Sequence, residues 1–297
     1  MNTSSEEIQK RFQSLFTLAD NISDAARQLL DKINRREMKL FDLKPHQRIF
    51  LFILTRSLKT YASIITLCKN GYGQDAATLL RSLLENLITA GYILKDKKTA
   101  DEKAARFVAY KWIIFKRQLP EQEKNLPQMT AHQKQIFMER KKKILEQYEA
   151  FKKKFRLRSD QALLTWSGKT VKDMAREISK KLLEEYETTF RLCSRFSHPS
   201  ILGDQEYMLQ DGKNLIFSPL PSLIGVAANL KNSMSLMIQF TELINIHFKA
   251  NEEQLIKNLY SEFASLPNIE KLEQDNPSSK PSQETTQIRE STIKFEF

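Results

Sequence analysis

Glycine and proline are scarce in this chain, because only 7 glycines and 9 prolines interrupt its 297 residues. A β-sheet protein of this length needs many more tight turns between short strands, and those turns draw on these two residues. Apolar residues recur instead at steps of three and four, as on one face of an α-helix. The sequence therefore predicts an all-α fold, a multi-helix bundle with few loops.

Periodicity and capping residues divide the chain into eight expected helices. Asp75 is expected to cap the third helix and Pro120 to end the fourth. The sixth should end at His198, because the residue before a proline disfavours helical backbone angles. Residues 121–128 and 199–220 are expected to be loops. The helices are predicted over residues 4–36, 45–70, 75–95, 99–118, 131–157, 170–197, 221–248 and 251–266.

Three segments follow from this division. Residues 1–44 form an N-terminal helical segment, and residues 45–266 form the helical bundle domain. From residue 267 to residue 297 the chain is polar and rich in Ser, Gln and Glu, which predicts a disordered tail.

Features of a secreted or membrane protein are lacking. The N-terminus has neither the basic start nor the apolar core of a secretory signal. Cys68 and Cys193 lie among apolar residues, so we expect two buried thiols rather than a disulfide framework. The most apolar run, residues 49–54, is far shorter than the ~20 residues of a membrane span. We expect a cytoplasmic protein that does not contact a membrane.

The chain is strongly basic, with a formal net charge of +11 and a pI of about 9.4. Such a charge favours polyanions, although a basic surface that is merely soluble is the alternative. Residues 134–158 hold ten Lys or Arg against three Glu on a predicted amphipathic helix. This stripe is either a solvated face or a nucleic-acid contact. The candidate contacts are Lys141, Lys142, Lys143, Lys152, Lys153 and Lys154.

Several kinds of site are disfavoured. The four histidines and two cysteines show no metal-ligand spacing, so no metal and no cofactor are expected. Gly168-Lys169-Thr170 is similar to the end of a phosphate-binding loop, but Leu163 stands where that motif needs glycine. A Ser-His-Asp hydrolase lacks its Gly-x-Ser-x-Gly turn.

A first candidate site lies on the third predicted helix. Arg81 and Glu85 are four residues apart and can pair on one helical face, with Tyr92 two turns further on. The three residues are expected to form either a buried structural ion pair near Tyr92 or one wall of a polar pocket.

A second candidate site lies near the end of the sixth predicted helix. Offsets of three, four and seven bring Arg191, Ser194, Arg195 and His198 onto one helical face. Histidine moves protons near neutral pH and arginine binds phosphate, and attack of a ribose 2′-hydroxyl on its own phosphate needs both. The alternative is a histidine that caps the helix end beside ordinary surface arginines.

Residues 45–250 resemble a bacterial helical family of unknown function, domain-of-unknown-function family 5677. The resemblance rests on Arg81-Ser-Leu-Leu-Glu85 with Tyr92, Trp166-Ser-Gly168, Tyr186, and Ser194-x-x-x-His198-Pro199-Ser200 in this order. It implies a helical fold and assigns no activity.

Arg191, six residues and His198 are also similar to the Arg-x(4-6)-His signature of HEPN ribonucleases. HEPN proteins often carry a polar residue after the arginine, where this chain has Leu192. The resemblance implies a HEPN-like, metal-independent endoribonuclease of a toxin or phage-defence system. Its partners would be RNA, an antitoxin or defence protein, and a second copy of the chain in a homodimer. The rival hypothesis is a non-catalytic helical module that binds nucleic acid or protein.

Overall fold

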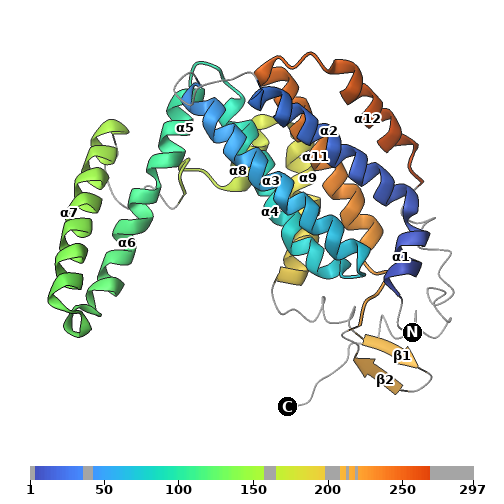
Figure 1. The fold of residues 1–297 in the computed structure, drawn as a ribbon, viewed down its shortest axis with the longest axis horizontal. Helices are drawn as coiled ribbons and strands as arrows, with labels where there is room; N and C mark the ends of the chain where they lie inside the picture. Colours follow the sequence, from blue (N-terminus) through green and yellow to red (C-terminus); the bar gives the residue numbers. More distant parts are fainter. Residues whose placement is uncertain are drawn as a thin grey trace.

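A computed structural model describes residues 4–35, 43–156, 165–197, 208–211, 214–217 and 220–267. Side chains are not described for Leu192, for residues 194–197 or for the two strands. The chain is an all-α bundle of long helices packed side by side, as predicted, with a helical hairpin that stands apart from it (Figure 1). Except for Pro267, the predicted disordered tail lies outside the described residues.

The elements follow one another with short connections. They are α1 (Ser5–Arg11), α2 (Gln13–Asn34), α3 (Pro45–Lys69), α4 (Gly73–Leu94), α5 (Ala100–Ala109), α6 (Lys111–Glu123), the 3-10 turn η1 (Leu126–Gln128), α7 (Ala131–Lys154), α8 (Val171–Ile178), α9 (Lys180–Ser197), β1 (Met208–Asp211), β2 (Asn214–Phe217), α11 (Val226–Phe248) and α12 (Glu253–Ser265).

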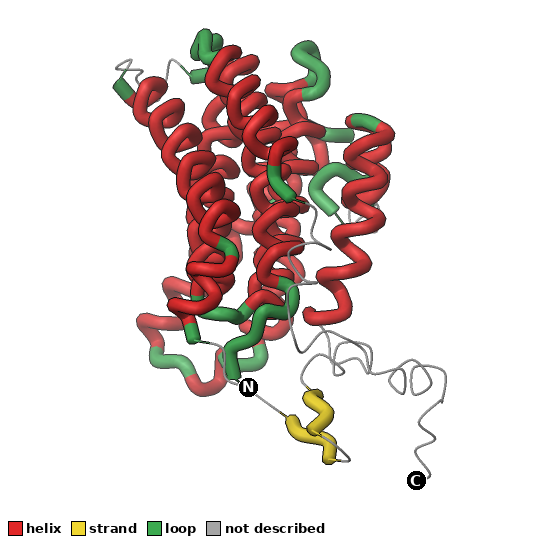
Figure 2. The backbone as a smooth tube through the Cα atoms, turned by 90° about the vertical axis from the view of Figure 1, so that its right-hand side faces the viewer, coloured by secondary structure: helices red, strands yellow, loops and turns green. Residues whose placement is uncertain are grey.

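The core of the bundle is built around α4, which packs against α3, α8, α9 and α11 (Figure 2). Side chains from α1, α2 and α12 join the same hydrophobic cluster, including the fully buried Ile8 and Ile22. The Tyr61 hydroxyl on α3 donates a hydrogen bond of 3.1 Å to the carbonyl of Ala19 on α2. The first two helices therefore complete the same core as the helices after residue 44, while a domain boundary at that residue stays a prediction.

The turn between α3 and α4 is held against the start of α11. Gly71 and Gly225 both adopt positive φ, of 79° and 74°. The Asn229 side-chain amide donates to the carbonyl of Gly73 at 2.8 Å. A Cβ on Gly73 would lie 2.4 Å from the carbonyl oxygen of Ile224, so only glycine allows the two backbones to approach this closely.

Helices α6 and α7 form an antiparallel hairpin that projects from the bundle, at the left of Figure 1. Its apolar side chains form two small clusters of their own, separate from the bundle core. One contains Ile113, Tyr148 and Phe151, and the other contains Leu119, Phe137 and Ile144. Thr130 caps α7 and Gln133 completes the capping box, as expected for this sequence. The hairpin is therefore an arm with its own interior.

Two predicted helices are each divided in the structure. The expected helix over 99–118 is interrupted at Tyr110, where α5 leaves the bundle and α6 enters the arm. The expected helix over 170–197 is interrupted at Ser179, whose backbone is extended and whose hydroxyl accepts from the Leu182 N–H at 3.1 Å. Ser179 thus begins α9 as an N-cap.

Other predicted boundaries were wrong. Pro120 does not end its helix, because the neighbouring Leu119 is buried against α7 and α6 runs on to Glu123. The expected loop over 199–220 contains an antiparallel pair, β1 and β2, in which Met208 faces Phe217. Asp75 lies in the first turn of α4 and does not cap it. Helix α11 begins at Val226, after the left-handed Gly225, and not at residue 221.

By length and composition, α3 is the one helix among the described residues that could cross a membrane. In the bundle it packs against α4, α11, α5 and α2. Its side chains Phe50, Leu54, Tyr61 and Ile64 are buried in the core. This packing is that of a central helix in a bundle.

Candidate functional site

The predicted pair of Arg81 and Glu85 forms on α4. The Arg81 Nε donates to a Glu85 carboxylate oxygen at 3.1 Å. The two side chains are 29% and 38% exposed, so the pair lies at the surface of the α4–α9 contact and is not buried as expected. Water reaches both groups, and the pair contributes little to stability by itself.

Aromatic rings of α9 cover the other side of Arg81. Its guanidinium carbon lies 4.1 Å from the centre of the Phe190 ring. The Phe190 ring in turn stacks on Tyr186, with centroids 4.7 Å apart and planes at 25°. Burial, followed by the nearby Glu85 carboxylate, raises the pKa of Tyr186. The result is a stack of cation, ring and ring, with Glu85 at one end.

Cys193 lies beneath this stack, one turn beyond Phe190 on α9. It is a free, buried thiol, as the sequence suggested. Burial raises the pKa of Cys193 to about 12, although the nearby Arg81 acts in the opposite direction. A thiol with such a pKa is a packing group and not a nucleophile near neutral pH.

Tyr92 belongs to a different group of residues at the end of α4. Its ring lies edge-on to Trp166 at 5.8 Å, and Trp166 also meets Phe107 edge-on at 5.2 Å. The Lys103 ammonium lies 4.3 Å from the centre of the Tyr92 ring and donates to the Tyr92 carbonyl at 3.0 Å. Burial lowers the pKa of Lys103. The structure thus divides the three predicted pocket residues between two places along α4.

The second predicted cluster lies largely outside the described residues. Helix α9 extends to Ser197, so Arg191, Ser194 and Arg195 occupy successive turns of one helix. Arg191 is exposed. It adds a small contribution to the lowered pKa of Glu187, which is set mainly by Lys172 at 2.6 Å. His198 and the side chains of Ser194 and Arg195 are not described.

Residues 47–215 match the model of a family described as Family of unknown function (DUF5677). The match covers more than half of the chain. The chain belongs to the DUF5677 family. The resemblance to that family seen in the sequence is confirmed, over a shorter stretch than residues 45–250. Neither the curated proteins nor the solved structures contain a match to this chain.

The DUF5677 match runs from the first turn of α3 to the second strand of the hairpin formed by β1 and β2. It contains the Arg81 stack on α4 and α9 and the whole arm formed by α6 and α7. Helices α1, α2, α11 and α12 lie outside it. Both candidate surfaces of this protein are therefore part of the DUF5677 segment.

The six predicted lysines of the DUF5677 arm divide into two kinds. Lys141 reaches across the hairpin to Glu123 on α6, with 2.5 Å between the charged groups. Lys152 lies 3.9 Å from Glu149 and 5.4 Å from the centre of the Tyr148 ring. These two lysines help to hold the hairpin together.

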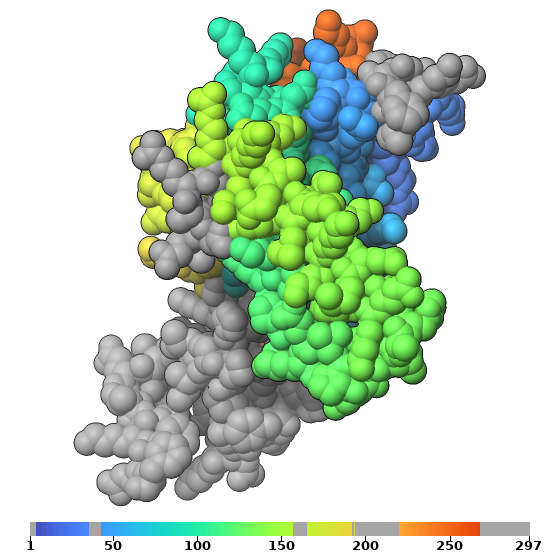
Figure 3. Space-filling view, turned by 90° about the vertical axis from the view of Figure 1, so that its left-hand side faces the viewer, coloured from blue at the N-terminus to red at the C-terminus, as the bar shows by residue number. Residues whose placement is uncertain are grey.

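The other four lysines point away from the seam between α6 and α7. Lys142, Lys143 and Lys153 are exposed and make no ion pair with another described residue. Lys154 is also exposed, and its ammonium lies 5.5 Å from the centre of the Phe155 ring. Figure 3 shows the face of the molecule that the arm occupies, in green. The arm offers these ammonium groups to an external partner.

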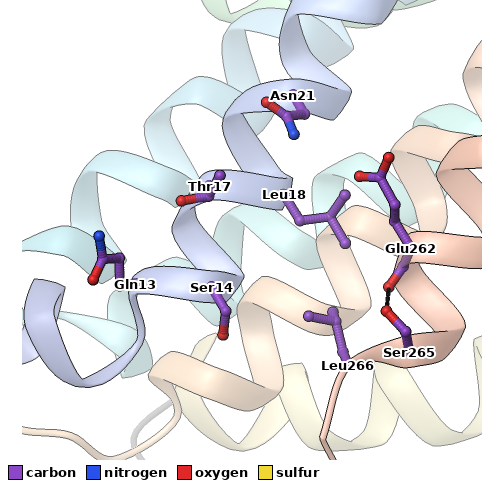
Figure 4. A pocket seen from close by; sticks show the side chains of 8 residues that line it. All are labelled: Gln13, Ser14, Thr17, Leu18, Asn21, Glu262, Ser265 and Leu266. Carbon is purple, nitrogen blue, oxygen red and sulfur yellow. Dashed lines mark hydrogen bonds between the residues drawn. The ribbon is translucent and has the colours of Figure 1, made fainter.

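A shallow hollow lies on the opposite side of the bundle, between α2 and α12 (Figure 4). Amide and hydroxyl side chains line most of it, including Gln13, Thr17 and Asn21 from successive turns of α2. Among the described residues, no three His, Cys, Asp or Glu side chains gather where a metal ion could be held. The hollow lies outside the DUF5677 match.

Sequence reasoning missed the partners of both α4 groups. Phe190 and Tyr186 were recognised as an apolar stripe of α9, but their contact with Arg81 was not foreseen. Trp166 was likewise known only as part of a motif and not as the ring that packs on Tyr92. The spacing of four between Tyr186 and Phe190 was the available signal that the two rings stack.

Proposed function

We propose that this DUF5677 protein binds nucleic acid through the basic arm formed by α6 and α7. The observation that supports this function is the set of exposed lysines on α7, on a hairpin that stands clear of the bundle. Lysines in such a position meet phosphates without displacing any contact of the fold.

Charge is concentrated in the arm. Residues 111–156 hold thirteen Lys or Arg and five Glu, so they supply eight of the chain's eleven net positive charges. Neutralising phosphates with such a surface releases counterions, which makes binding strong at low salt and weak at high salt. A second copy of the arm is a poor partner, because like charges repel.

An anionic membrane is a poorer partner than nucleic acid. Membrane-surface helices use a continuous apolar face, and that of α7, which includes Phe137, Ile144 and Tyr148, is buried against α6. The exposed apolar residues Met138 and Leu145, 54% and 37% exposed, are flanked by lysines. They are too few to form a second apolar face.

Binding would be measured by fluorescence anisotropy of labelled RNA and DNA with the full chain, at several salt concentrations. Changing Lys142, Lys143, Lys153 and Lys154 to Gln should weaken binding and reduce the slope of log K against log salt by at least about 2. A matched control changes the exposed Lys10, Lys59, Lys181 and Lys257 to Gln. Equal effects of both variants, or binding to anionic vesicles but not to nucleic acid, would contradict the proposal.

RNA cleavage is the second candidate function. In it, Arg191 holds the scissile phosphate, His198 transfers the proton, and Ser194 and Arg195 assist. The continuity of α9 through Ser197 supports a shared face for the first three of these positions in the chain. Such an enzyme would be HEPN-like and metal-independent, and RNA gathered by the arm would be its substrate.

A further inference from the structure

The lysines of α7 come in two triplets, Lys141–Lys143 and Lys152–Lys154. The triplets are eleven residues apart, which is close to three helical turns. Corresponding lysines therefore point in nearly the same direction and lie about 16.5 Å apart along the helix. Helix α7 is unbroken from Ala131 to Lys154, so this spacing is fixed by the backbone.

The two sides of α7 differ in charge. With the buried seam of Phe137 and Tyr148 as reference, one flank carries Lys142 and Lys153 together with Lys134 and Arg156. Its one acidic residue is Glu149. We call this flank, defined by Lys134, Lys142, Lys153 and Arg156, the basic flank.

The opposite flank carries Lys143, Lys154 and Arg140, with Glu139 at its edge. Glu146 lies between the two flanks. Arg140 is also turned toward the ring of Phe115, at 5.8 Å from its centre. The positive charge that remains available is therefore greater on the basic flank.

The aromatic rings of the arm are turned inward. Phe137, Tyr148 and Phe151 are buried in the seam. Trp112 and Phe155 pack on the same two small clusters. No aromatic side chain among the described residues of the arm is classed as exposed. Proteins that bind single strands stack bases on exposed rings, and the arm offers them none.

We infer that the basic flank of α7 binds double-stranded nucleic acid through its phosphates, an inference that rests on the nucleic-acid binding proposed above. A duplex holds two rows of phosphates at a fixed distance across a groove, about 12 Å for the major groove of B-DNA. The rigid spacing of Lys142 and Lys153 suits two such rows, with lysine reach making up the difference. A single strand has no fixed spacing, and its bases would find no ring to stack on. Contacts to phosphates alone carry no sequence preference.

The test compares three labelled ligands with the full chain at one salt concentration. These are an RNA duplex and a DNA duplex of about 20 base pairs, longer than the ~36 Å of α7, and an oligouridine of equal length. At least one duplex should bind about tenfold more tightly than the single strand. Single-strand binding as tight as duplex binding would overturn the duplex inference and leave the proposed function standing. Absence of binding to all three would overturn both.

Two double variants locate the contact. Lys142→Gln with Lys153→Gln removes two charges from the basic flank, and Lys143→Gln with Lys154→Gln removes two from the opposite flank of the same helix. The first should reduce the salt slope for the duplex by about 2, and the second by less than half as much. Equal effects of the two variants would contradict the basic flank as the binding surface.

Discussion

The ammonium group of Lys116 on α6 lies 3.9 Å from the centre of the Tyr148 ring on α7. Tyr148 is only 3% exposed, and Lys152 approaches the same ring from its own helix. Cations and rings thus alternate along the seam of the arm, and the basic residues that close the hairpin differ from those that face outward. An open hairpin would lose the fixed spacing of its outward lysines.

Tyr148→Ala should therefore loosen the arm without unfolding the bundle. Truncating a buried aromatic side chain costs about 3–5 kcal/mol, and here that cost falls on clusters separate from the bundle core. Hydrogen exchange should become faster in α6 and α7 and stay unchanged in α3 and α4, and nucleic-acid binding should weaken. Tyr148→Phe, which keeps the ring, is the control. Faster exchange throughout the bundle would show that the arm is not an independent unit.

Gly73→Ala tests the close contact between α4 and α11. The added Cβ would lie 2.4 Å from the backbone oxygen of Ile224, and a backbone atom cannot easily move aside. We expect the free energy of unfolding to fall by about 1–3 kcal/mol in a denaturant titration. Gly91→Ala is the matched change, because its Cβ would meet only the end of the Ile178 side chain, at 3.2 Å. That variant should lie within about 1 kcal/mol of the parent. Equal losses would contradict the account of Gly73.

His247 should make stability depend on pH. Burial, then the nearby His46 and Lys97, lowers its pKa below the ordinary value of 6.5. The unfolded chain takes up a proton there more readily than the folded one, so the free energy of unfolding should fall as the pH drops below about 6.5. It should level off below the pKa of the folded state. His247→Gln should flatten this part of the curve, measured by denaturation at several pH values. An unchanged curve would mean that other groups cause the dependence.

Local signals in the sequence were reliable where one residue decides the outcome. Thr130 and Thr170 cap their helices as predicted, since each needs only a hydroxyl and a backbone N–H three residues ahead. Ser179 does the same but was overlooked, because the apolar stripe continues through it from Ile178 to Leu182. Periodicity reports the face of a helix and not its continuity.

Tertiary contacts decided the rest. The spacing of Glu85 and Tyr92 on α4 gave their direction but not their neighbours, so the sequence could not foresee that α9 would cover Arg81 while Trp166 would cover Tyr92. Likewise, Lys141 and Lys142 are adjacent and chemically equal, yet only Lys141 reaches Glu123 across the hairpin. Pro120 stays helical because Leu119 packs against α7, which no local rule reports.

The cleavage hypothesis makes its own prediction. RNA incubated with the full chain in excess chelator should be cut, and both Arg191→Ala and His198→Ala should abolish the cutting, because one removes the phosphate ligand and the other the proton-transfer group. Cleavage that survives both changes would place the activity elsewhere. If the parent cuts no RNA, the function is binding alone.

Lysine footprinting tests the central claim most directly. The full chain would be acetylated with and without a saturating RNA or DNA duplex, and the reactivity of each lysine read by mass spectrometry. An ammonium group held by phosphates is shielded from the reagent, so Lys134, Lys142 and Lys153 should be protected, while Lys59 and Lys257, which lie on the bundle, should react as before. Protection confined to lysines outside α7, or none while the duplex is bound, would contradict the assignment of the arm as the nucleic-acid surface.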